Sequence, residues 1–359
     1  MPLENNIKSQ NAVMRYLKDN MGTLIGLFAM CVILSFTTNG VFYSQRNLVN
    51  VLRQVSSNAC LAFGMTFAII TGGIDLSVGS ILALAGTLSA GLIVNGMGFL
   101  RSLTDLIVSW FPSFAETSVY FYMNSAADWL GSGFSVPAAV IIALIIGTAL
   151  GIFNGLVIAK TTIPPFIVTL AMMQMARGAA YIYSNGQPIR AMIPEYQIIG
   201  TGYLGPIPYP VIYMTVFLIV CIILLSKTRF GRHVYAVGGN DKAAIFSGVN
   251  VSRTKMMVYT MSGFLAAFTG VVLCARMASG QPTAGQSFEM DAIAATVLGG
   301  TSMSGGVGKI GSTMIGVLII GVLNNGLNLL GLNSFWQQIA KGIVILLAVY
   351  VDMLKKRRK

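Results

Sequence analysis

The side chains that could carry out acid–base or nucleophilic chemistry are few and scattered in this 359-residue sequence. The single histidine, His233, has no partner that would form a catalytic dyad or a metal site. The four cysteines all lie inside apolar runs and lack metal-like or disulfide-like spacing: Cys31, Cys60, Cys221 and Cys274. We therefore expect no catalytic residue, no metal site and no cofactor, and a chain that is not an enzyme.

A glycine-rich segment at residues 306–311 formally matches the dinucleotide-binding fingerprint. It lacks the preceding strand and the βαβ unit that give this fingerprint its meaning. Lys309 also suggests a phosphate-binding loop, but Ile310 occupies the position where Ser or Thr must bind magnesium. We expect these glycines to allow a tight turn and a close approach of helices, and we expect that the chain does not hydrolyse ATP by itself.

The most polar internal segment, residues 227–256, lies between long uncharged stretches. It holds one acid, Asp241, and six of the 23 Lys and Arg residues: Lys227, Arg229, Arg232, Lys242, Arg253 and Lys255. Such a segment is typical of a loop through which a membrane protein contacts a partner in the cytosol. A plain connector is the alternative.

Within this loop, residues 238–248 predict a turn, a short helix and a stop. The Asn240 side chain can cap the helix by accepting a hydrogen bond from a free backbone N–H. Gly248 suits the left-handed position that ends a helix. The short helix would leave two apolar side chains, Ile245 and Phe246, to dock into a groove of the partner.

Polar side chains inside the apolar runs could line a pathway or join helices. For Asp75 we prefer a structural cap of the following helix to a functional intramembrane acid. Three asparagines of one run lie at helical spacing and must face protein or water, so that both interpretations stay open. The candidates for a pathway are Asp75, Ser77, Asn154, Gln174, Asn324, Asn325 and Asn328.

The composition indicates a membrane protein. Hydrophobic residues make up 55% of the chain and charged residues only 9%, against roughly 25% charged in a soluble domain. The apolar runs do not alternate, which excludes a membrane β-barrel, and many approach the ~20 residues of a membrane-spanning helix. We predict an all-α, polytopic membrane protein with about ten transmembrane helices, some short or broken, at roughly 22–38, 54–72, 77–95, 136–159, 165–184, 210–226, 257–278, 291–303, 311–331 and 335–352.

The charges predict the orientation. With a cytosolic N-terminus, sixteen Lys and Arg residues fall inside and four outside, as the positive-inside rule requires. The net charge of +12 is spread over these loops and does not indicate nucleic-acid binding. The predicted parts are a cytosolic N-terminal segment (1–21), a transmembrane domain (22–354) with an extracytoplasmic insertion (97–135) and the cytosolic loop (227–256), and a basic cytosolic tail (355–359).

Six motifs resemble the sugar-import permeases of ATP-binding-cassette transporters, a family that includes ribose, xylose and galactoside permeases. The resemblance covers nearly the whole chain, and the motifs that carry it are residues 73–80, 238–250, 281–285, 289–295, 298–302 and 324–331. The insertion at 97–135 is a departure, because ribose permeases join these spans more tightly.

This resemblance implies a permease that works as a homodimer in the inner membrane, with an ATPase subunit and an extracytoplasmic sugar-binding protein as partners. Glu289 and Asp291 are candidate contacts for the binding protein. A nucleoside, an autoinducer or a branched-chain amino acid are alternative solutes, and an ion-coupled carrier is an alternative class. By matching motif, the residues that couple to the ATPase are Gly238, Gly239, Asn240, Ala243, Ala244, Ser247 and Gly248.

Overall fold

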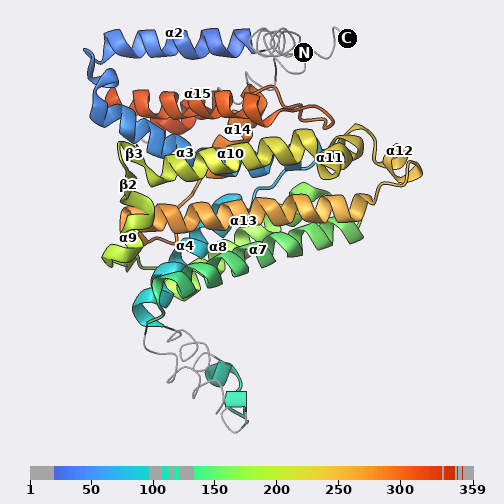
Figure 1. Cartoon of the computed structure of the whole chain (residues 1–359). Coiled ribbons are helices and arrows are strands. Elements are labelled where there is room, and N and C mark those ends of the chain that lie inside the picture. The colour runs from blue at the N-terminus through green and yellow to red at the C-terminus, as the bar shows by residue number, and fades with distance from the viewer. Residues whose placement is uncertain are drawn as a thin grey trace. The chain divides into compact units, whose positions relative to one another are not determined.

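The computed structural model describes residues 20–96, 107–113, 117, 119–120, 133–333, 335–343, 346 and 350. Helices dominate these residues, and the predicted all-α fold is confirmed (Figure 1). Nearly all of the N-terminal segment, most of the insertion at 97–135 and the basic tail lie outside the described residues.

The chain divides into two compact units, and the first contains residues Met1–Ile74, Tyr213–Lys255 and Met290–Lys359. A further helical segment covers 335–343. The elements that lie in this unit wholly or for the most part are α2 (Met21–Thr37), the 3-10 helix η1 (Val41–Tyr43), α3 (Gln45–Ile70), α10 (Tyr209–Lys227), α11 (Arg229–Gly239), α12 (Asp241–Phe246), α14 (Phe288–Leu298) and α15 (Ile310–Leu329).

The second unit contains residues Asp75–Ile212 and Met256–Glu289. Its helices are α4 (Val78–Asn95), α7 (Val136–Lys160), α8 (Pro165–Ser184), α9 (Pro194–Thr201) and most of α13 (Val251–Met277). Its strands form two short antiparallel pairs, β1 (Ile189–Arg190) with β4 (Ser279–Gly280) and β2 (Tyr203–Leu204) with β3 (Ile207–Pro208).

Glycines of α15 allow three other helices of the first unit to pack closely against it. A Cβ at Gly316 would overlap the Ala295 carbonyl of α14. Gly321 faces Val55 of α3, and Gly326 faces Leu34 of α2, which runs alongside α15 in Figure 1. Small residues at helix contacts are typical of membrane proteins, where close van der Waals packing holds helices together.

Helix α4 forms the core of the second unit, and its residues 78–93 are all buried. It packs against α7 and α8, and a Cβ at Gly86 would lie 2.9 Å from the Gly270 carbonyl oxygen of α13. Gly151 of α7 similarly lies against Gly263 of α13. The same small-residue packing therefore operates in both units.

Among the described residues, five helices are long and apolar enough to cross a bilayer: α4, α7, α10, α13 and α15. Helices also occupy the other five predicted span positions, namely α2, α3, α8, α14 and the segment 335–343. With eleven residues, α14 is about 16 Å long and too short for a ~30 Å hydrocarbon core. The eighth segment is thus short, as predicted.

Two helices, α3 and α13, begin nine and six residues earlier than predicted because their first turns are polar. Helix α3 begins at Gln45, and the Ser44 hydroxyl accepts a hydrogen bond from the backbone N–H of Asn47 at 3.3 Å. Helix α13 begins at Val251, with the Asn250 side chain accepting from the backbone N–H of Arg253 at 2.8 Å. A hydropathy scan does not detect polar first turns, but the capping residues Ser44 and Asn250 indicate where the two helices begin.

We expect Gly316→Ala to lower the thermal unfolding midpoint of the purified chain in detergent, because the added methyl group collides with the α14 backbone. The matched control is Gly26→Ala in α2, where nothing lies within 4 Å of the added atom. Alanine is favoured over glycine in a helix by up to about 1 kcal/mol, so that this control should leave the midpoint unchanged or raise it. Equal midpoints for the two variants would contradict the proposed contact.

Candidate functional site

The predicted cytosolic loop is largely helical, and helix α11 within it was not predicted. The Thr228 hydroxyl caps α11 by accepting a backbone hydrogen bond at 3.2 Å. Phe230 stacks on Phe67 of α3 with ring centroids 5.9 Å apart, and Val234 and Val237 are buried. The signal that sequence reasoning missed was this apolar i, i+4, i+7 pattern among the charges.

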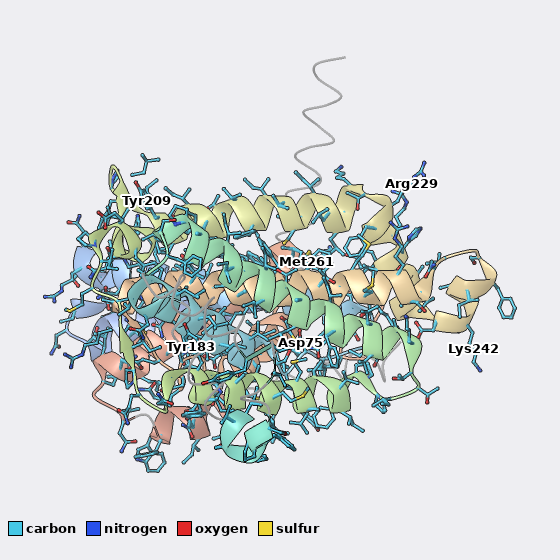
Figure 2. The ribbon with its side chains drawn as sticks, turned by 90° about the horizontal axis from the view of Figure 1, so that it is seen from below. Asp75, Tyr183, Tyr209, Arg229, Lys242 and Met261 are labelled. Carbon is cyan, nitrogen blue, oxygen red and sulfur yellow. The ribbon has the colours of Figure 1, made fainter. Side chains whose placement is uncertain are left out.

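The short helix α12 confirms the predicted turn, helix and stop. Asn240 Oδ1 accepts a hydrogen bond from the Ala243 backbone N–H at 3.0 Å, and Gly248 has a φ of +79°. Ile245 is 59% exposed and Phe246 is 92% exposed. In Figure 2, Lys242 also points away from the ribbon. Two apolar side chains are therefore presented beside a cation on a capped helical turn.

The predicted coupling residues differ in accessibility, and their role in coupling stays a prediction. Gly239, Asn240, Ala243, Ser247 and Gly248 are exposed. Ala244 is only 3% exposed, so its side chain offers little surface to a partner.

Gly238 lies at a junction of three backbone segments of the first unit. A Cβ at this position would overlap the carbonyl oxygen of Ile70, at the end of α3, and would lie 2.6 Å from the Gly306 nitrogen. The Gly306 N–H donates to the same Ile70 oxygen at 2.8 Å. Gly238 therefore allows α11 to touch both the end of α3 and the glycine-rich loop before α15, a packing role that leaves little surface for a partner.

Two side-chain contacts hold α11 and α12 against other segments of the first unit. The Tyr235 hydroxyl donates to the Gly308 carbonyl at 2.6 Å, and burial raises the pKa of this phenol, which is already a protonated donor at neutral pH. Lys255, in the first turn of α13, pairs with Asp241 of α12 at 2.6 Å. Both α11 and α12 are thereby held to other parts of the first unit.

Three pathway candidates form one buried network in the second unit. Asp75 Oδ1 accepts from the backbone N–H of Ser77 at 3.0 Å and from its hydroxyl at 2.5 Å. Asp75 Oδ2 accepts from the Ser262 hydroxyl at 2.6 Å, and Asn154 donates to the Ser77 hydroxyl at 3.0 Å. Figure 2 labels Asp75 within the ribbon. The network supports the structural interpretation, since it orders the start of α4 and joins it to α7 and α13.

The neighbouring asparagines of α15 have different partners. Asn324 donates to Asp291 Oδ2 at 3.2 Å. Asn325 and Asn47 exchange two amide hydrogen bonds of 2.8 and 3.0 Å, a pairing that the sequence did not reveal. Asn328 is exposed and accepts from Gln337 at 2.7 Å. Gln174 is exposed on α8, in the other unit.

The two candidate contacts for the binding protein, Asp291 and Glu289, differ in accessibility. Asp291 is 2% exposed and bonds to Lys341 Nζ at 2.9 Å, so its buried carboxylate offers almost no surface to a binding protein. Glu289 is partly exposed and is an electrostatic partner of Arg177. Among the described residues, no group of three or more His, Cys, Asp or Glu residues could hold a metal ion.

We expect Asp75→Ala to destabilise the purified chain by about 3 kcal/mol, because the backbone N–H of Ser77 and two buried hydroxyl groups lose their acceptor. Gln174→Ala, which changes an exposed polar residue, is the control and should have little effect. Denaturant unfolding in detergent measures both. If Asp75→Ala leaves the free energy of unfolding unchanged, Asp75 does not have the structural role proposed here.

The chain matches a family model described as the permease component of a branched-chain amino acid transport system over residues 47–349. It is similar to the ribose import permease protein of Bacillus subtilis, with 47% identity over 93% of both chains. The ribose import permease protein of Escherichia coli K12 is 41% identical over 93% of this chain and 94% of its own. The xylose transport system permease protein of Haemophilus influenzae is 34% identical over 94% of this chain and 98% of its own.

No solved structure matches the chain significantly. The family model nevertheless covers well over half of the sequence, and the curated relatives match it along almost their full length. The chain therefore belongs to the branched-chain amino acid transport system permease family of multi-pass membrane proteins.

Proposed function

We propose that this chain is the membrane-spanning permease subunit of an ATP-binding-cassette importer for a ribose-type monosaccharide. The observation that carries the proposal is the 47% identity to a ribose import permease over nearly the whole chain. Identity is lower, at 34%, for a xylose permease, which favours ribose among the pentoses. The chain supplies the passage, and a separate ATPase supplies the energy.

Helix α12 is the proposed contact with the ATPase. Its exposed Ile245 and Phe246 can fill an apolar groove, the usual way in which a short helix docks. The caps at Asn240 and Gly248 and the Lys255–Asp241 ion pair hold the helix in shape. Movement imposed on α12 would pass through α11 to the end of α3 and to the loop before α15, which meet at Gly238.

The proposed assembly contains two copies of this chain in the inner membrane, an ATPase subunit on the cytosolic side and a sugar-binding protein outside. The asymmetry of Lys and Arg between the two sides supports cytosolic termini and a cytosolic α11–α12 region. Glu289 remains a candidate contact for the binding protein, since it is partly exposed.

A second candidate solute is a branched-chain amino acid, because the description of the family model names such a transport system. Deleting the gene for this chain in its own cells should abolish initial uptake of radiolabelled D-ribose and leave L-leucine uptake unchanged. A loss of leucine uptake alone would favour the amino acid. Ribose flux through the purified chain in liposomes, without an ATPase, would favour an ion-coupled carrier or channel.

We expect Phe246→Asp to reduce ribose uptake by about tenfold or more, because the loss of a docked aromatic anchor weakens a protein contact by at least that factor. The control, Phe246→Leu, keeps an apolar side chain and should retain most of the activity. Co-purification of the ATPase with each variant from membranes measures the contact directly. Unchanged uptake and co-purification in Phe246→Asp would exclude α12 as the docking element.

A further inference from the structure

Among the described residues of the first unit, four buried side-chain oxygen atoms lack a hydrogen-bond partner; besides one each on Asp241 and Thr301, two belong to the cluster around Asp291. These two are Asp291 Oδ1 and Asn324 Oδ1, whose residues are 2% and 3% exposed. Leaving such an acceptor unpaired in an apolar interior costs about 1–3 kcal/mol. The carboxylate of buried Asp75 differs, because both of its oxygens accept hydrogen bonds, and the unpaired oxygen of its network belongs to Asn154.

Three helices bring this cluster together. Asp291 lies on α14, Asn324 on α15 and Lys341 on the helical segment 335–343. Both Asn324 Nδ2 and Lys341 Nζ donate to Asp291 Oδ2, at 3.2 and 2.9 Å. The two unpaired oxygens therefore belong to directly bonded neighbours.

The chemistry of the cluster suits a ligand with hydroxyl groups. A hydroxyl both donates and accepts, so it can donate to the free oxygens of Asp291 and Asn324. The Lys341 ammonium, with three N–H donors, can also donate to a hydroxyl oxygen. Since the Lys341–Asp291 pair is neutral overall, the cluster favours an uncharged ligand over an ion.

The cluster lies within the predicted membrane region, near one end of its helices. Asn324 is five residues before the end of α15, and Lys341 is six residues after the start of the segment 335–343. At 1.5 Å per residue, both lie about 8–9 Å from the connection between these helices. In the proposed topology this connection is on the extracytoplasmic side, where a solute would enter.

We propose that Asp291, Asn324 and Lys341 form a polyol-binding station that receives hydroxyl groups of the sugar in the outer half of the first unit. This inference rests on the proposed import function and adds residues to it. The free oxygens of Asp291 and Asn324 accept hydrogen bonds from sugar hydroxyls, and Lys341 both neutralises Asp291 and donates to the sugar.

The test compares initial uptake of D-ribose with uptake of its 2-deoxy, 3-deoxy and 5-deoxy analogues in native cells, each at a concentration that saturates the binding protein. Asn324→Leu removes the Oδ1 acceptor, together with the Nδ2 donor to Asp291, with little change in size. We expect ribose to lose its advantage over at least one analogue by about fivefold, the worth of one neutral hydrogen bond. Because the binding protein is the same in every strain, its own selectivity cancels in the comparison.

The matched control is Thr313→Val, an isosteric change at a buried hydroxyl of α15 that already bonds to Thr66 at 2.9 Å. This control should leave the ratio of ribose to analogue uptake unchanged. If Asn324→Leu does not accumulate in the membrane, Asn324→Ser serves instead, with a shorter acceptor and the same expected direction.

The outcomes separate this inference from the proposed function. If wild-type cells import ribose through this chain but the ratio is unchanged in the Asn324 variants, the two oxygens bind water only and the station is overturned. If deletion of the chain leaves ribose uptake intact, the import function itself fails, and the station fails with it. An equal change in ratio for Thr313→Val would also overturn the proposal, because the effect would not be local.

Discussion

Close approach of helix backbones is the constraint on which this structure depends. In a bilayer, lipid chains are as apolar as leucine, so helices gain little from hiding apolar side chains and must be held by dense packing and hydrogen bonds. Gly316, Gly321 and Gly326 provide the close contacts of α15 in one unit, and Gly86 and Gly151 provide those of α4 and α7 in the other. The polar groups that this packing encloses must then find partners within the protein.

That requirement explains why polar residues that look alike in the sequence differ in the structure. Asp75 and Asp291 are both buried acids beside apolar helices. Asp75 has donors at both oxygens and orders the start of a helix, whereas Asp291 has donors at only one. Burial alone therefore does not identify a binding residue; the number of unused hydrogen-bonding positions separates the two.

Much of the fold followed from apolar periodicity and run length, and the short helix α12 followed from its capping residues. What could not be predicted depended on tertiary contacts. A hydropathy scan does not find helix α11, because the helix carries too many charged residues. Its apolar face is recognised only from the tertiary contact in which Phe230 stacks on Phe67. Asp291 bonds to Asn324 and Lys341, which are distant from it in sequence, and Asn47 pairs with the equally distant Asn325. Local spacing contains no information about such partners.

The reciprocal amide pair between Asn47 and Asn325 has a mechanical consequence. Two hydrogen bonds in a buried site, where water cannot compete for them, resist sliding or rotation between α3 and α15. With Thr66 and Thr313 bonded further along the same two helices, α3 and α15 are cross-linked near both of their ends. Any change of shape during a working cycle would then carry these two helices as one rigid body, and bending would have to occur in other segments of the chain.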